Sequence, residues 1–231
     1  MLLLLFISQL LFIFPTLPLY MLITRQNIKS ILPLKPLGWA NAGYVVAMTA
    51  LLFPTAAFLS ASMTIFFPNA AMELTSGFTM ENLVPLLFVL AVMPSICEEL
   101  SFRGAILSAS DGMKIGNAAL LNGVLFGLVH MNPQQIPYAT FLGVVFALFV
   151  LHTKSILSSI LAHFMVNGPN VLMAVLVVEL PDEIHEAAAA NTDGSILPAL
   201  IVLSVIASVC FLAFLYVYNQ FKIHNLQRNS P

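Results

Sequence analysis

The chain has 231 residues, of which 60% are hydrophobic and only 8% are charged, and its formal net charge is −2 at pH 7. Soluble domains carry about a quarter charged residues, so this composition excludes an ordinary water-soluble enzyme and a disordered chain. The slightly negative charge provides no basic surface, and we therefore expect no nucleic-acid partner. The apolar content suffices for about seven helices of ~20 residues, the length that crosses a bilayer. The composition predicts an all-α polytopic transmembrane helix bundle.

Seven apolar segments, separated by polar or charged residues, are predicted to span the membrane. They cover approximately residues 2–24, 38–67, 83–108, 117–132, 136–152, 156–178 and 196–221. The first segment lacks the basic n-region of a secretory signal and is too long for its apolar core, so we interpret it as a retained helix. The fourth and fifth segments are short and are expected to be tilted or half-buried in protein.

Basic residues alternate from loop to loop along the predicted topology. Lys and Arg outside the spans lie after the first, third and fifth spans and in the C-terminal tail, whereas the loops after the second and sixth carry only acidic charges. Because basic residues favour the cytoplasmic side of short loops, this pattern predicts an N-out, C-in orientation. The compact size favours the inner membrane of a prokaryotic cell.

The third span contains ionisable residues, which are costly at membrane depth and commonly mark a site. Glu99 and Arg103 are four residues apart and are expected to pair on one helix face. Glu98 points about 100° away from Glu99 and is therefore free for chemistry. The alternative is a purely structural ion network buried in the bundle.

Two later spans carry polar residues at helical spacing. Gly123 and Gly127 form a small-residue face that admits close approach of a neighbouring helix, and His130 follows at the end of the same span. In the sixth span His163 and Asn167 share one face. An interfacial histidine and a hydrogen-bond clasp between helices are the alternatives for these side chains.

The depths of these residues agree when counted along their helices. At ~1.5 Å per residue, His163 lies ~12 Å from the loop at 154–155, Glu98 ~16–20 Å from the loop at 111–114, and His130 ~20 Å from Asn117. We therefore expect Glu98, His130, His163 and Asn167 to surround one polar cavity.

Three strings in this chain resemble the three motifs of the CPBP family of polytopic intramembrane proteases, which includes the Rce1-type CAAX prenyl endopeptidases and the bacteriocin-processing Abi proteins. The strings are Glu98-Glu99-x-x-x-Arg103, Phe126-x-x-x-His130 and His163-x-x-x-Asn167, in the family's order. The resemblance divides the chain into N-terminal transmembrane helices at 1–79, a CPBP-like catalytic core at 80–180, and an acidic external loop, last helix and cytoplasmic tail at 181–231.

The resemblance implies two alternative chemistries for the same residues. In a metal-free glutamate protease, Glu98 and His130 activate a water molecule, while His163 and Asn167 stabilise the oxyanion. In a metalloprotease, Glu98, His130 and His163 ligate one Zn²⁺ that keeps an open position for water. Glu99 and Arg103 are supporting residues in both, and the sequence leaves the choice between zinc and no metal open.

These observations predict an intramembrane endopeptidase that hydrolyses a membrane-associated or lipidated, CAAX-like peptide. Its partners are then the lipid bilayer and the peptide or lipidated protein substrate, with no prediction of oligomeric state. A non-catalytic bacteriocin immunity protein and a small proton-coupled transporter are the alternatives. The intact motif set argues against the first, and the absence of two matching halves with broken helices argues against the second.

Overall fold

The fold is helical throughout the part of the chain that the computed structural model describes, residues 2–67, 77–181, 183–184 and 196–229. Within these ranges the extended pairing is limited to one isolated antiparallel bridge between Leu34 and Ser155. The predicted all-α class is therefore confirmed. Most of the predicted acidic loop at 179–195 lies outside the described residues.

The described helices follow the predicted spans closely. In chain order they are α1 (Leu2–Ser8), η1 (Gln9–Ile13), α2 (Thr16–Thr24), α3 (Ile28–Ile31), α4 (Trp39–Met63), η2 (Met80–Asn82), α6 (Leu83–Leu87), η3 (Phe88–Val92), α7 (Met93–Glu99), η4 (Leu100–Ile106), α8 (Ile115–Val129), α9 (Gln135–Thr153), α10 (Leu157–Val178) and α12 (Leu197–Asn229). The elements η1, η3 and η4 are π-helical turns, and η2 is a 3₁₀ turn.

Six helices within the described residues are long and apolar enough to cross a membrane. The fourth predicted span, 117–132, corresponds to α8, which has only 15 residues and is about 22 Å long at 1.5 Å per residue. A helix of this length is shorter than the ~30 Å hydrocarbon core. The predicted count of seven is thus met by six helices of membrane length and one shorter apolar helix.

The last helix continues to Asn229, well beyond the predicted end at residue 221. Its extension is held by protein contacts that the hydropathy pattern does not contain. Asn225 is 1% exposed and exchanges hydrogen bonds of 2.9 and 3.1 Å with the side chain of Asn41 on α4. Arg228 then donates to the carbonyl of Leu37.

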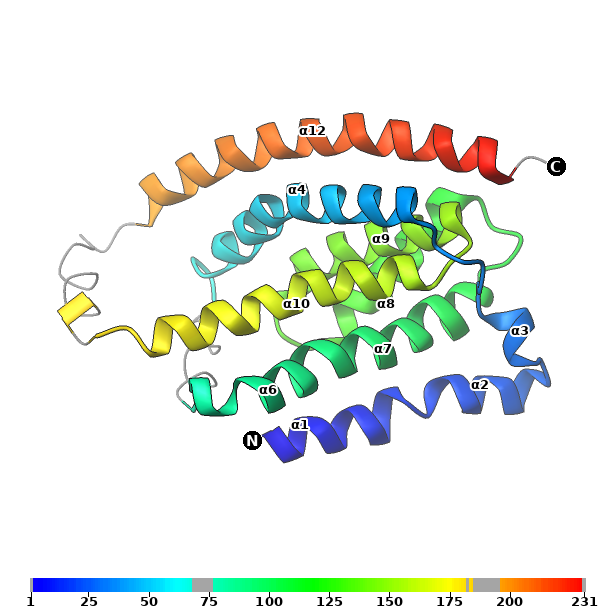
Figure 1. The fold of residues 1–231 in the computed structure, drawn as a ribbon, viewed down its shortest axis with the longest axis horizontal. Helices are drawn as coiled ribbons and strands as arrows, with labels where there is room; N and C mark the ends of the chain where they lie inside the picture. The colour runs from blue at the N-terminus through cyan, green and yellow to red at the C-terminus, as the bar shows by residue number, and fades with distance from the viewer. Residues whose placement is uncertain (1, 68–76, 182, 185–195, 230–231) are drawn as a thin grey trace.

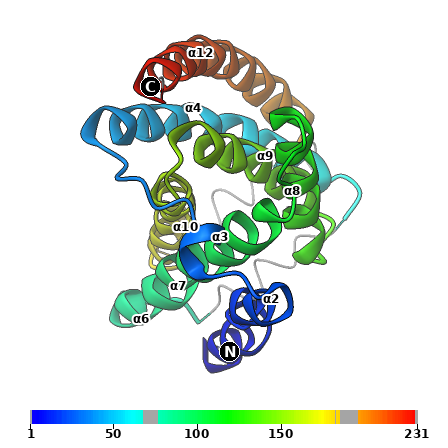
Figure 2. The same cartoon turned by 90° about the vertical axis from the view of Figure 1, so that its right-hand side faces the viewer.

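The helices form a layered bundle. Figure 1 shows α12 and α4 along one side and the α1–α2 segment along the opposite side, with α7 to α10 between them. The view along the bundle in Figure 2 places α12 and α2 at the same opposite edges. The largest apolar core joins α4, α9, α10 and α12 through side chains that include Met48, Phe146, Phe149 and Phe221.

The basic loops gather at one end of the bundle. The backbone N–H of Lys35 donates to the carbonyl of Lys154, and the Lys35 ammonium donates to Asn229 at 3.0 Å. Asn229 in turn donates to the carbonyl of His152 at 2.8 Å. The loops that were predicted to share one side of the membrane therefore lie together. Which side is cytoplasmic stays a prediction.

The remaining loops meet at the opposite end. The Gln134 side chain donates to the carbonyl of Phe67 at 3.2 Å, and the backbone N–H of Met80 donates to the Glu179 carboxylate at 3.0 Å. Because α8 begins after a loop at the basic end and Gln134 follows it at this end, α8 runs from the basic end towards the opposite one.

The first predicted helix is interrupted in its middle. A π-helical turn at η1 ends at Ile13, and α2 starts at Thr16, after Pro15. Proline lacks the N–H that a continuous helix needs, so the regular hydrogen-bond ladder is broken at this point. The Ile13 carbonyl accepts a hydrogen bond from the hydroxyl of Ser101, at 2.8 Å. This bond ties the interrupted helix to η4.

Candidate active site

The four polar residues expected at one site line a single cavity of about 660 Å³. Glu98 comes from α7, His130 from the residue that ends α8, and both His163 and Asn167 from α10. The spatial prediction made from their spacing and depth is therefore met by the geometry. Their chemical roles stay a prediction.

Gly123 and Gly127 bring α8 close to α9 and thereby place His130. A Cβ atom added to Gly123 would lie 2.6 Å from the backbone nitrogen of Val144, closer than real contacts allow. At Gly127 an added Cβ would lie 2.9 Å from the carbonyl oxygen of Ile136. Only glycine permits this helix separation, as the small-residue pattern predicts.

The expected ion pair between Glu99 and Arg103 is present. Its N–O distance is 3.1 Å, and both side chains are fully buried. The guanidinium also donates to the carbonyl of Gly143 at 3.0 Å, and its central carbon lies 4.5 Å from the centre of the Phe126 ring. Arg103 thus ties α7 and η4 to α8 and α9, which suits a supporting residue.

Glu99 has a second partner that sequence reasoning did not anticipate. Its Oε1 accepts a hydrogen bond of 2.8 Å from Nδ1 of His163. His163 therefore lies between the two adjacent glutamates, since its Nε2 is 4.0 Å from Oε2 of Glu98. No spacing rule within one helix could reveal this contact, because it joins residues 64 positions apart.

Glu98 differs from Glu99 in lining the cavity and in the partner of its Oε1. Oε1 accepts a hydrogen bond of 3.1 Å from the side-chain amide of Gln9. Oε2 is buried, accepts no hydrogen bond and lies on the His163 side. One carboxylate oxygen is therefore held, and the other remains available to a reactant.

The hydrogen bonds of the two histidines fix which ring nitrogen carries the proton in the neutral state. Nδ1 of His130 lies 2.7 Å from the carbonyl oxygen of Phe126, and a carbonyl can only accept, so Nδ1 must donate. Nδ1 of His163 likewise donates to the ionised Glu99. In the neutral imidazoles Nε2 therefore keeps its lone pair, the form required of a base or a metal ligand.

Asn167 is one turn beyond His163 and is anchored through one N–H. Its Nδ2 donates to the carbonyl of Leu90 at 3.1 Å, which fixes the amide against η3. An asparagine amide has two N–H donors, so one remains for another acceptor. This is the donor that an oxyanion at the cavity would need.

The donor types at the site fit zinc, but their positions do not converge. Two imidazole nitrogens and one carboxylate are a known catalytic zinc set. Within the described residues, however, no group of three or more His, Cys, Asp or Glu side chains is close enough to hold a metal ion. Zinc ligation by Glu98, His130 and His163 stays a prediction.

Gln9 is a site residue that sequence reasoning missed. It lies in η1 and lines the same cavity as Glu98. The available signal was weak: a single amide within a long apolar run, which is costly in a membrane unless it has a partner. The sequence pattern does not predict which residue is the partner of Gln9.

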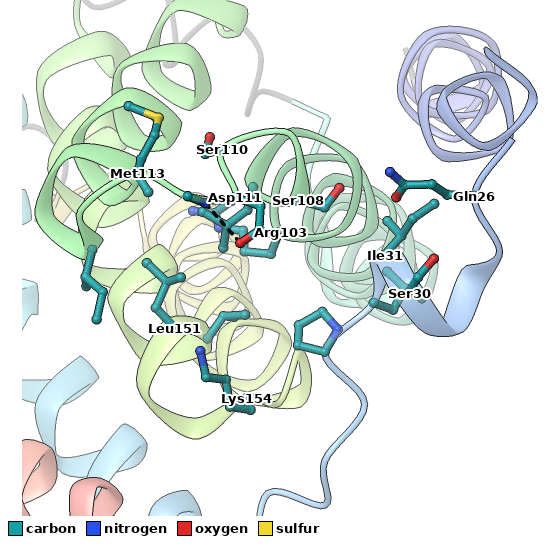
Figure 3. Close-up of a pocket in the computed structure, with 17 residues that line it drawn as sticks. Gln26, Ser30, Ile31, Arg103, Ser108, Ser110, Asp111, Met113, Leu151 and Lys154 are labelled. Atoms are coloured by element: carbon teal, nitrogen blue, oxygen red, sulfur yellow. Dashed lines mark hydrogen bonds between the residues drawn. The ribbon is translucent and has the colours of Figure 1, made fainter. Parts of the chain in front are cut away.

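A second polar cavity of about 450 Å³ lies at the basic end of the bundle. Figure 3 shows Arg103 at this cavity, together with Ser108, Asp111 and Lys154. Its lining shares no residue with that of the cavity containing Glu98. Arg103 is the only expected site residue that reaches it, so the candidate active site is the other cavity.

Fold and site together define a polytopic helical membrane protein with a buried carboxylate–imidazole centre. Residues 79–168 match the family described as type II CAAX prenyl endopeptidase Rce1-like. Over 92 residues the chain is 34% identical to "Putative membrane peptidase YdiL" of Bacillus subtilis (strain 168). These matches confirm the predicted resemblance of the segment 79–168 to the CPBP membrane proteases.

The aligned region covers 39% of this chain and 38% of the Bacillus protein. No solved structure matches the chain. The matched segment contains Glu98, Glu99, Arg103, His130, His163 and Asn167. Gln9 lies outside it.

Proposed function

We propose that the protein is an intramembrane endopeptidase that hydrolyses a peptide bond in a membrane-associated or lipidated, CAAX-like substrate. The observation that carries this proposal is the single cavity that collects Glu98, His130 and His163 among apolar helices. The matches to an Rce1-like family and to a named membrane peptidase support the reaction class.

Peptide hydrolysis requires an activated water, a stabilised oxyanion and a protonated leaving amine. Oε2 of Glu98 is the free carboxylate oxygen. It takes a proton from the water while the water oxygen attacks the carbonyl carbon of the substrate. Nε2 of His130 accepts the water's second hydrogen bond and orients the attack. Glu98 then delivers its proton to the departing amine nitrogen when the C–N bond breaks.

Side chains of α10 stabilise the oxyanion in this mechanism. The free N–H of Asn167 donates to the developing negative charge. When His163 carries protons on both ring nitrogens, Nδ1–H remains bound to Glu99 and Nε2–H can donate to the oxyanion. Glu99 and Arg103 act by holding this imidazole in place rather than by touching the substrate.

The proposal is tested with purified protein in lipid nanodiscs and an internally quenched peptide that carries an S-farnesyl cysteine. Glu98→Gln preserves shape but removes the base, so the cleavage rate should fall by about 10²–10⁴-fold. Glu81→Gln, at an exposed carboxylate outside the cavity, is the matched control and should cleave normally. Cleavage by Glu98→Gln at the wild-type rate would contradict the proposed mechanism. The same peptide without the farnesyl group tests the lipid requirement.

The alternative zinc mechanism is tested on the same preparations. One equivalent of bound zinc in the wild type, lost in His130→Ala and His163→Ala, would assign the metalloprotease. Full activity after metal removal would assign the metal-free glutamate mechanism. Asn167→Ala should reduce cleavage by about 10²–10³-fold through loss of an oxyanion donor, without altering zinc content.

A further inference from the structure

We propose that Gln9 is a positioning residue that orients the Glu98 carboxylate for catalysis. The inference rests on the proposed function, because it assumes that Glu98 is the base. Gln9 lies in the N-terminal helix, far outside the segment 79–168 that matches the protease family. It adds to the site an element that the three motifs do not contain.

The geometry divides the work between the two oxygens of Glu98. Nε2 of Gln9 donates to Oε1 at 3.1 Å, which leaves Oε2 on the side of His163, 4.0 Å from Nε2. A carboxylate on a flexible side chain can rotate and present either oxygen. With Oε1 held, the oxygen that receives the water's proton is always the one beside the imidazole.

An amide is well suited to this task because it donates without carrying charge. A lysine or arginine at the same place would form an ion pair with Glu98 and oppose its protonation during the reaction. The existing arginine of the site is instead engaged by Glu99 and by the carbonyl of Gly143. Glu98 therefore has a neutral partner, and Glu99 has a charged one.

The backbone holds Gln9 at the cavity by a second, independent contact. Gln9 opens the π-helical turn η1, and the turn ends at Ile13, whose carbonyl accepts from the Ser101 hydroxyl at 2.8 Å. Ser8, Gln9 and Ile13 all line the cavity. The interrupted helix thus forms one wall of the site, tied to η4 by Ser101 and to α7 by Gln9.

Few residues of this wall are buried inside the protein. Among the six membrane-length helices of the described residues, the segment Phe6–Thr24 is the least buried, with 6% of its most apolar 18-residue stretch buried. Its apolar packing on the bundle is centred on Leu17 of α2, and the hydrogen bonds of Gln9 and Ile13 are specific attachments at the site. A glutamine that served only packing could be replaced by an apolar side chain of similar volume without consequence.

Gln9→Met makes that replacement, because it keeps the volume and removes the donor. With the quenched farnesyl peptide in nanodiscs, we expect kcat to fall by about 10- to 100-fold. Displacing a catalytic group by ~1 Å lowers the rate by about this factor. KM should change by less than about threefold, and the thermal unfolding midpoint should not fall. Gln9→Glu, which also keeps the shape but repels Glu98, should lose at least as much kcat.

Leu11→Met is the matched control, because Leu11 lies on the same turn, is 63% exposed and does not line the cavity. It should cleave at the wild-type rate. In the Glu98→Gln background, Gln9→Met should cause no further loss, since residues that act as one unit are not additive.

The outcomes separate this inference from the proposed function. Normal kcat in Gln9→Met, with Glu98→Gln inactive, would overturn the role of Gln9 and leave the protease assignment intact. Normal cleavage by Glu98→Gln would overturn both. Equal losses for Gln9→Met and Leu11→Met, with a lowered unfolding midpoint, would assign Gln9 to structure instead of positioning.

Discussion

Two adjacent glutamates on one helix have been given opposite environments. Glu99 is fully buried and shares its Oε1 between Arg103 and His163. Glu98 instead meets a neutral amide through its Oε1 and lines the cavity, which Glu99 does not, although Oε2 of each glutamate is buried without a hydrogen bond. Burying a charge is tolerable when it is paired, whereas a reacting carboxylate must reach the cavity where a substrate can bind. The difference assigns support to Glu99 and chemistry to Glu98.

Glu99→Gln tests that assignment through stability. The substitution leaves the Arg103 charge buried without a countercharge, which should lower the free energy of unfolding by about 3–5 kcal/mol. The unfolding midpoint in a fixed detergent should therefore fall by several degrees. Glu98→Gln is the comparison and should shift the midpoint much less. The Glu98 carboxylate forms no ion pair with an arginine or lysine in the described residues, and His163 lies 4.0 Å from it. Equal midpoints for the two variants would contradict the supporting role of Glu99.

At the scale of helices, the site depends on the close packing of α8 against α9. Gly123→Ala should separate them, because the new Cβ would lie 2.6 Å from a backbone nitrogen and 2.8 Å from a backbone oxygen of α9. Overpacking of this kind costs about 1–3 kcal/mol, and it should also displace His130 and reduce cleavage.

Gly116→Ala on the same helix is the control, since an added Cβ there meets nothing within 4 Å. Alanine is the better helix former, so stability should be unchanged or raised by up to about 1 kcal/mol. A loss in Gly116→Ala as large as in Gly123→Ala would show that the loss does not depend on the close approach of α8 to α9.

The sequence predicts those helix-scale features that follow from spacing within one segment. The pair Glu99–Arg103 and the glycine face of α8 are both set by the 3.6-residue period of the helix. Contacts between distant segments are not encoded in this way. The bond from Gln9 to Glu98 depends on a π-helical turn and on a break at Pro15, and hydropathy registers neither.

The extension of α12 is another feature beyond sequence reasoning. The predicted end at residue 221 reflects the arrival of polar residues, which normally indicates a membrane boundary. Asn225 is nevertheless buried against Asn41, and this reciprocal pair stabilises further helical turns among polar side chains. Composition alone cannot distinguish such a paired amide from one exposed to solvent.

At the scale of the whole molecule, charge is distributed between the two ends of the bundle. Lys35 and Lys154 meet at one end, beside the last turn of α12, whereas Glu179 bonds to Met80 at the other. In Figure 1 the first turn of α12 lies at the end of the bundle opposite to the last turn of the same helix. Since basic residues are retained on the cytoplasmic side, the end with Lys35 and Lys154 should face the cytoplasm.

Cysteine labelling in intact cells tests this orientation. In a chain whose Cys97 and Cys210 have been replaced by serine, a cysteine at Glu183, which is exposed, should react with a membrane-impermeant maleimide from outside. A cysteine at the exposed Lys114, which lies between the cavity-lining residues Met113 and Ile115, should react only after the cells are opened. The two sites lie at opposite ends, so each serves as the control for the other. Labelling of Lys114→Cys but not Glu183→Cys in intact cells would show that the orientation is the reverse of the predicted one. The basic loops would then lie outside, contrary to the positive-inside rule.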